Sequence, residues 1–172
     1  LKKASFSFGF PHLDRNNIRY KKSLKGGAKF DAGIYAISAA HELFGSEYEV
    51  LSANSFYEKN FEVDTSGIIL LKYENFIVEL NWFFGAAYKN QAEFWFEDAH
   101  LLAEMFFSKP RGSKIDIKII RDYELVSTIR FDPENQFKEM FKYFNSCTNK
   151  QYLNDLNNLK MSLNLLSLLN DR

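Results

Sequence analysis

Two polar side chains, Asp31 and Tyr35, lie four residues apart in "LKGGAKFDAGIYAISAAHELFG", residues 24–45. In a helix this spacing places the carboxylate and the phenol one turn apart on one face. A phenol can donate a proton to a carbonyl oxygen as that oxygen becomes an alkoxide, and it can accept one in the reverse direction. A neighbouring carboxylate can orient a substrate hydroxyl or tune the phenol. The pair is therefore a candidate for proton transfer at an alcohol or carbonyl group.

Gly26 and Gly27 come directly before this helix. Glycine lets another group approach the backbone closely, and a helix N-terminus favours oxyanions, so both residues are candidates for substrate binding. A structural interpretation stays open beside the chemical one. A Gly-Gly pair is often only a turn, and an acid in a first turn often complements the helix dipole, for about 0.3–1 kcal/mol. A tyrosine on an amphipathic helix is often a packing residue at the core boundary.

The loop before the glycines is basic. Arg19 is a candidate to hold a phosphate or a hydroxyl of a substrate, and the alternative is a solvated loop arginine. Lys21, Lys22 and Lys25 lie close to it in the sequence and favour a phosphorylated sugar, with a solvated loop as the equal alternative.

The elements that must position these residues follow from hydrophobic periodicity. Alternation predicts a strand over 3–10. A helix is expected over 28–44, where apolar residues and His41 recur on one stripe, with Gly45 as its C-terminal cap. His41 is expected to be a satisfied core or boundary histidine, since the three histidines have no metal-ligand spacing. Seven further strand candidates follow, at 47–57, 62–72, 75–84, 91–97, 99–106, 114–120 and 122–130.

Two helices are expected at the end of the chain. The first begins with Asp132 as N-cap and Pro133 at the first helical position. The second covers 151–170 and carries leucines at helical spacing, which pack either on the chain's own sheet or on another domain or chain. This order predicts a single α+β domain over 1–172, an open, mainly antiparallel sheet with helices packed on one face. The other face needs water or a partner, and a second copy using the same face is the partner we expect.

Composition narrows the function classes. The chain has 172 residues with 46% hydrophobic content, and 22 Lys and Arg balance 22 Asp and Glu. A neutral chain is not expected to bind nucleic acid or an anionic membrane electrostatically. No segment approaches a membrane-spanning length. Cys147 is the only cysteine, which excludes an internal disulfide and a thiolate metal cluster. A cytoplasmic location is the expectation.

One stretch resembles a known family. "NNIRYKKSLKGGAKFDAGIYAISAAHELFG" is similar to the signature of the glucose–fructose oxidoreductase / inositol dehydrogenase (Gfo/Idh/MocA) family, in its second domain. The family pattern is Asn-Ile-Arg, then Leu-Gly-Gly-Gly-Ala-Leu-x-Asp-x-Gly-x-Tyr or His, then a helix ending in Leu-x-Gly. "FSFGFP", "VDTSGIILLKYEN", "GAAYKNQAEFWFEDAHL" and "ENQFKEMFKYF" resemble further family segments, so the similarity covers nearly the whole chain. Two departures are Lys25 in place of the first glycine and Lys29 in place of the usual leucine.

The resemblance implies a function. Members are NAD- or NADP-dependent oxidoreductases acting on sugars, sugar nucleotides and polyols. Their second domain has the open-sheet fold of the glyceraldehyde-3-phosphate dehydrogenase C-terminal domain and supplies the substrate site. Carried over by position, Tyr35 is the proton donor or acceptor and Asp31 its polar companion. A tyrosine rather than a histidine at this position resembles the branch with glucose–fructose oxidoreductase and the sugar-nucleotide ketoreductases.

The family's other half is not found in this sequence. There is no Gly-x-Gly-x-x-Gly unit, and the one Lys-Pro, Lys109–Pro110, lacks the family's preceding Glu. We therefore expect the chain to be the C-terminal half of a two-domain enzyme, inactive in redox chemistry without its N-terminal Rossmann domain, which binds NAD or NADP. The alternative is a non-catalytic dimerisation or scaffold module that works through its exposed sheet face.

Overall fold

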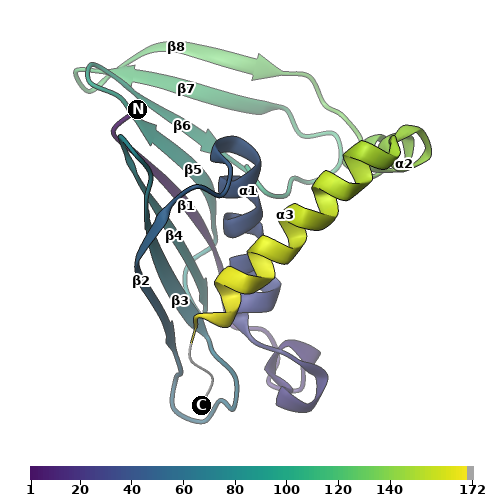
Figure 1. Ribbon diagram of the computed structural model, residues 1–172. Coiled ribbons are helices and arrows are strands. Elements are labelled where there is room, and N and C mark those ends of the chain that lie inside the picture. Colours follow the sequence, from purple (N-terminus) through teal and green to yellow (C-terminus); the bar gives the residue numbers. More distant parts are fainter. Residues whose placement is uncertain (170–172) are drawn as a thin grey trace.

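The structure, a computed structural model, describes residues 1–169 and contains one eight-stranded sheet with helices on one side (Figure 1). The strands are β1 (Lys3–Phe10), β2 (Glu49–Phe56), β3 (Ser66–Lys72), β4 (Ile77–Phe84), β5 (Lys89–Trp95), β6 (His100–Glu104), β7 (Ile115–Arg121) and β8 (Glu124–Phe131). The strand order is β2-β3-β4-β1-β5-β6-β7-β8. All neighbours pair antiparallel except β1 and β4, which are parallel. The predicted α+β class and mainly antiparallel sheet are confirmed.

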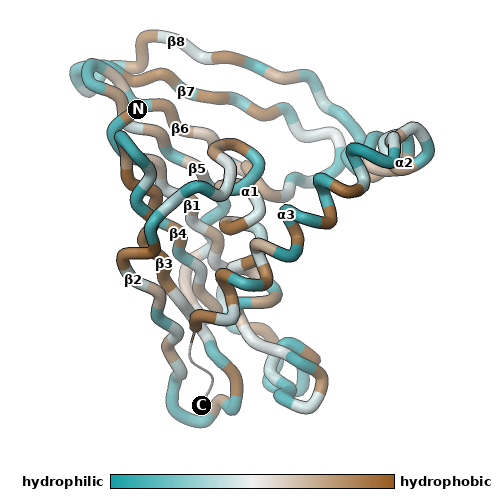
Figure 2. The backbone as a smooth tube through the Cα atoms, in the orientation of Figure 1, coloured by the Kyte–Doolittle hydropathy of each residue, from teal (hydrophilic) through white to brown (hydrophobic). Residues whose placement is uncertain are grey.

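Strand alternation separates the two faces of the sheet. On the helix side, Ala4, Phe6, Leu80 and Trp82 are completely buried. On the other side, Lys3 and Glu79 form an ion pair across β1 and β4. Hydrophobic residues alternate with hydrophilic ones along the strands (Figure 2). The strand predicted at 75–84 corresponds to β4, which lies inside the sheet between β3 and β1.

The expected 28–44 helix forms in two parts. Lys29–Gly33 is a π-helical turn, and α1 (Ile34–Phe44) continues it to the predicted cap at Gly45, whose φ is 75°. The backbone N–H of Ile34 donates to the carbonyl of Lys29, five residues back, which widens this turn. The prediction of a helix over 28–44 is therefore wrong about its first turn, which is π-helical rather than α-helical.

The two C-terminal helices differ from the expectation at their ends. Helix α2 (Gln136–Ser146) begins after Asn135, because the Asn135 side chain accepts hydrogen bonds from the N–H groups of Phe137 and Lys138, each at 3.2 Å. Asp132 and Pro133 precede the helix rather than start it, so that prediction was wrong. Helix α3 (Asn149–Ser167) has Thr148 as its cap. Residue 170, the last of the expected 151–170 helix, lies outside the described residues.

Helix α3 packs on α1 through its C-terminal part. Ser162, Leu165 and Leu166 are buried, whereas Leu153 and Leu159 are about half exposed. The leucine stripe is therefore only partly covered by the described residues. None of the described helices is long and apolar enough to cross a membrane.

A buried polar contact ties α1 to α3 and confirms the expectation for His41. The Nδ1 atom of His41 lies 2.9 Å from Oγ of Ser162, and its Nε2 lies 2.9 Å from the hydroxyl of Tyr48. The His41 ring also stacks on the Tyr48 ring at 5.6 Å between centroids. Burial lowers the pKa of His41 and raises that of Tyr48. His41 is therefore neutral in the fold and satisfied at both nitrogens.

The connection between β2 and β3 anchors the start of the π turn. The backbone carbonyl of Asp64 accepts from the N–H of Ala28 at 2.9 Å, and its carboxylate accepts from the N–H of Lys29 at 2.7 Å. Asp64 is 3% exposed. A Cβ on Gly27, whose φ is 129°, would overlap the Asp64 carboxylate, and a Cβ on Gly26 would overlap the carbonyl of Arg19. The space beside these two glycines is thus occupied by the Asp64 carboxylate and the Arg19 carbonyl of the chain itself.

Replacing Asp64 by alanine removes the acceptor for a buried helix-start N–H. We expect the free energy of unfolding to fall by about 1–3 kcal/mol, the cost of an unsatisfied buried donor, as measured by urea denaturation. The exposed neighbour Glu62, replaced by alanine, serves as the matched control and is expected to change stability by less than about 0.5 kcal/mol. Equal effects of the two substitutions would show that the carboxylate does not hold the turn.

The lowered pKa of His41 predicts a pH dependence. In the unfolded chain a histidine takes up a proton near pH 6.5, whereas in the fold His41 resists protonation. The contribution of His41 to the free energy of unfolding is therefore present above about pH 6.5. It is lost as the pH falls through the lower pKa that His41 has in the folded chain. We expect the urea midpoint of the parent chain to fall more between pH 7.5 and pH 5.5 than that of His41→Gln. The same fall in both chains would contradict this assignment.

Candidate functional site

The basic loop before the glycines is fixed by one aromatic anchor, Tyr20. Its ring is 7% exposed and packs on Phe61 and Phe84, at 4.8 and 5.6 Å between centroids. Its hydroxyl accepts from the backbone N–H of Leu13 at 3.1 Å. This anchor holds the 3₁₀ turn Ile18–Tyr20, and with it Arg19, against the start of the π turn.

Arg19 and Asp31 form an ion pair at the edge of a cavity. The guanidinium Nε of Arg19 donates to Oδ2 of Asp31 at 2.6 Å, and the two side chains are 38% and 30% exposed. The arginine was predicted as a substrate-binding group and the aspartate as a polar companion of Tyr35. In the structure these two side chains pair with each other, a contact that neither prediction included.

Four of the predicted site residues line one cavity of about 180 Å³. These are Arg19, Gly26, Gly27 and Asp31, and they are joined there by apolar side chains that include Phe30. Gly27 also donates its N–H to the carbonyl of Arg19 at 2.9 Å. The loop, the glycine turn and the first helical turn therefore meet at a single hollow.

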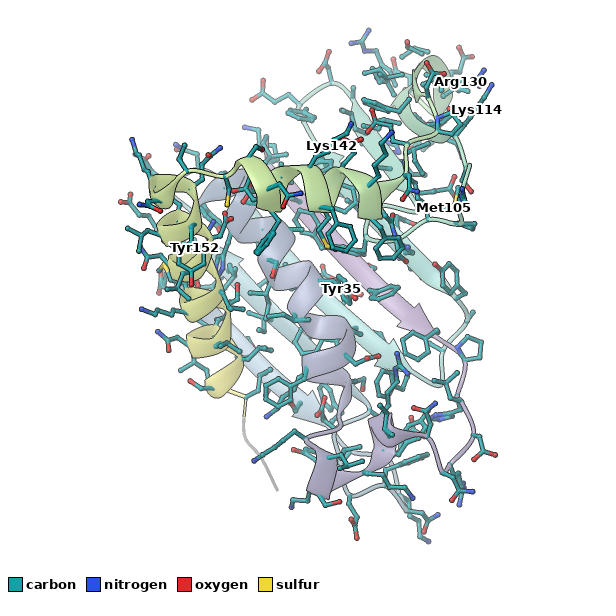
Figure 3. The ribbon with its side chains drawn as sticks, turned by 90° about the vertical axis from the view of Figure 1, so that its right-hand side faces the viewer. Tyr35, Met105, Lys114, Arg130, Lys142 and Tyr152 are labelled. Atoms are coloured by element: carbon teal, nitrogen blue, oxygen red, sulfur yellow. The ribbon has the colours of Figure 1, made fainter. Side chains whose placement is uncertain are left out.

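Tyr35 lies outside that cavity, further along the helix. Its side chain is 46% exposed. The ring contacts Phe8 edge-on at 5.4 Å, with an interplanar angle of 83°, and lies 6.3 Å from Phe107. Figure 3 looks onto the side of the molecule that carries Tyr35, with α2 above it. The ring is thus held by packing while part of the side chain remains accessible to solvent.

An ionised carboxylate offers about four lone-pair sites. The bond from Arg19 fixes the orientation of Asp31 and leaves acceptor capacity for a hydroxyl group in the cavity. A phenol held by aromatic contacts loses little entropy when it meets a substrate oxygen. The arrangement can therefore bind a polyhydroxylated ligand beside Asp31 and exchange a proton at Tyr35.

Sequence reasoning missed Asp64, the residue that determines where the site helix begins. It lies in the 62–72 segment, which was predicted as a strand, whereas β3 begins only at Ser66. Its partners, Ala28 and Lys29, are about 35 residues earlier, and no local pattern marks a contact of that range. Among the described residues, no group of three His, Cys, Asp or Glu gathers as a metal site.

Comparison with known proteins places the chain in context. The sequence pattern of the GFO/IDH/MocA C-terminal domain matches residues 1–101. A dTDP-3,4-didehydro-2,6-dideoxy-alpha-D-glucose 3-reductase of Saccharopolyspora spinosa is 29% identical over 145 residues, which cover 84% of this chain and 43% of that protein. A reductase of the same name from Streptomyces violaceoruber is 30% identical over 123 residues, 70% of this chain and 36% of that protein.

Solved structures share the fold. The 3-ketoreductase KijD10 from Actinomadura kijaniata, in complex with NADP and TDP-benzene, superposes with a TM-score of 0.82 at 24% identity, covering 97% of this chain and 51% of that one. An aldose-aldose oxidoreductase from Caulobacter crescentus gives a TM-score of 0.68 at 18% identity, over 85% of this chain and 44% of that one. The chain spans about half the length of the relatives it matches. It belongs to the GFO/IDH/MocA family, as a C-terminal domain of that family.

Proposed function

We propose that this chain is the substrate-site half of an NAD- or NADP-dependent oxidoreductase acting on a sugar or sugar nucleotide. The observation that carries the proposal is the half-exposed Tyr35 side chain, which follows one turn after Asp31, the partner of Arg19 in an ion pair. Relatives named as dTDP-sugar 3-reductases, and the TDP-benzene and NADP bound to KijD10, support a sugar nucleotide and a nicotinamide cofactor. A cytoplasmic location, suggested by this cofactor class, is part of the proposal.

The residues of this chain have distinct tasks in that reaction. The Tyr35 hydroxyl donates a proton to the oxygen of the reacting carbon during reduction and takes it back during oxidation. Asp31 accepts a hydrogen bond from a neighbouring sugar hydroxyl, and Arg19 holds the carboxylate in place. Gly26 and Gly27 shape the cavity wall. The cofactor supplies the hydride.

The described residues do not themselves fit a dinucleotide. The sheet contains one parallel pair, β1 and β4, and the 66 residues that separate these two strands hold β2 and β3 as well as α1 rather than a simple βαβ unit. We propose that a Rossmann domain of the same protein binds NAD or NADP. Helix α2, which lies above Tyr35 in Figure 3, supports a domain partner there, because its Phe137, Met140, Phe141 and Phe144 are 53–74% exposed.

The proton role of Tyr35 is tested in the whole protein that carries both halves. Tyr35→Phe keeps the ring packing on Phe8 and removes the hydroxyl. We expect kcat to fall about 10²–10⁴-fold, the usual contribution of a positioned acid or base, with NADPH or NADH and a keto-sugar nucleotide as substrates. Tyr123→Phe, at a fully exposed tyrosine in the β7–β8 turn, is the control. An unchanged kcat/KM for Tyr35→Phe would reject the role.

A second part of the proposal concerns the open face of the sheet. Phe56, Ile77, Phe83 and Trp95 point away from the helices and are 39–53% exposed. We propose that two copies of the chain associate through this face, which leaves the Tyr35 side for the cofactor-binding half. The same surface is what a non-catalytic dimerisation or scaffold module would use, so the two functions are separated by the Tyr35 experiment above.

Association through the sheet is tested by sedimentation of the chain. Phe83→Lys puts a charge into the contact and is expected to weaken self-association at least tenfold, because an unpaired buried charge is costly. Phe137→Lys places the same charge on α2, on the helix side, and is expected to leave association unchanged. If only Phe137→Lys produces monomers, the sheet face is not the interface.

A further inference from the structure

A second cavity lies on the other side of the glycine turn. It encloses about 160 Å³ between the 22–30 segment and the β2–β3 connection. Three of its lining residues are Lys22, Lys25 and Lys29, and the opposite wall includes Tyr57 and Glu62. Three lysines thus line one small hollow in a chain of zero formal charge.

The two cavities adjoin each other. Lys25, Gly26 and Phe30 line both of them. The cavity of about 180 Å³ is also lined by Arg19 and Asp31. A ligand lying across Lys25 would therefore have one end among the lysines and the other beside the proposed sugar site.

The charge of this region is positive even when its acids are counted. Residues 15–30 contain six Lys and Arg and no Asp or Glu. In the lysine cavity, three lysines face the carboxylates of Glu62 and Asp64. The Asp64 carboxylate already accepts the backbone N–H of Lys29 at 2.7 Å, and it is nearly completely buried. The residues that line the cavity therefore carry three positive and two negative formal charges.

Two of the lysines occupy positions that are costly for lysine. Lys25 has φ 57° and ψ 34°, a left-handed conformation that glycine adopts without strain. Lys29 is 4% exposed, and burial of a long charged side chain is rare. These positions are also the two at which the sequence departs from the Gly and Leu of the family pattern. The left-handed backbone at Lys25 is the observation that points to a functional constraint on a lysine amine beside this cavity.

The size of the cavities limits what they hold. Each is smaller than the roughly 300–1,000 Å³ of a pocket for a drug-sized ligand. Each therefore suits a small group rather than a nucleoside. Lysine binds phosphate as a point charge with three donors.

We propose that the lysine cavity binds the diphosphate of a nucleotide ligand, with Lys22, Lys25 and Lys29 as its cationic wall. The proposal rests on the proposed function and adds to it the position of the charged group. Phosphate in this cavity directs an attached sugar across Lys25 toward Asp31. A diphosphate also occurs in the dinucleotide cofactor, so the two sources are separated in the test.

The experiment is calorimetric titration of the chain with dTDP, inorganic pyrophosphate and NADP at fixed ionic strength. We expect dTDP and pyrophosphate to bind and to compete with each other. Lys25→Gly and Lys29→Leu are each expected to weaken binding about tenfold, the loss of one charge-assisted hydrogen bond. Lys25→Gly removes backbone strain and so keeps the fold. Lys21→Gln changes an exposed lysine of the same loop that lines neither cavity, and it is expected to bind like the parent.

Each outcome decides the proposal. Binding of dTDP that depends on Lys25 and Lys29 supports a substrate site, and NADP binding with the same dependence and higher affinity assigns the site to the cofactor. No binding of any of the three ligands, or binding that Lys25→Gly and Lys29→Leu leave intact, overturns it. Tyr35→Phe is expected to bind dTDP like the parent, so a failed catalytic role and a failed phosphate site give different results.

Discussion

The position of the site depends on one contact, between Asp64 and the start of the π turn. A helix start leaves four N–H groups without intrahelical partners. Here the backbone and side chain of a single residue from the β2–β3 connection satisfy two of them, at Ala28 and Lys29. Gly27 must lack a side chain for the carboxylate to fit. The helix N-terminus, which often binds a ligand anion, is therefore occupied by the chain's own Asp64 carboxylate.

Packing on Trp82 sets the distance between the site helix and the sheet. The Trp82 indole on β4 is completely buried between two glycines, Gly33 of the π turn and Gly67 of β3. A Cβ on Gly33 would lie 2.8 Å from the indole, and one on Gly67 would overlap it. Within residues 1–169 the Nε1 of Trp82 has no hydrogen-bond acceptor, so close packing is maintained despite an unsatisfied donor. Because Asp64 fixes the start of the helix and Trp82 its distance from the sheet, Tyr35 is left on the accessible side.

The sequence predicts much of this fold because its signals are local. Alternation in 3–10 and the apolar stripe of 28–44 locate β1 and the site helix, and the short turns between strands indicate an antiparallel sheet. The failures come from competing or long-range interactions. Asp132–Pro133 has the composition of a helix start, yet the Asn135 side chain satisfies the first N–H groups and the helix begins there. The π turn depends on Trp82 and Asp64, which lie 30 to 50 residues away. Contacts of that sequence separation produce no periodic pattern in the sequence.

The candidate site, like the fold, could be predicted from the sequence only in part. Spacing places Asp31 and Tyr35 on one helix, and the resemblance assigns their roles, but neither reveals that Arg19 binds Asp31 across a loop. That bond changes what the arginine can do, because a guanidinium already paired with a carboxylate is a weaker anchor for a phosphate than an unpaired one. Further positive charge lies with Lys22, Lys25 and Lys29, which line the neighbouring cavity. The glycine turn thus lies between the Arg19–Asp31 pair and the three lysines, and the proposed ligand, with an uncharged sugar end and a diphosphate end, would span the two.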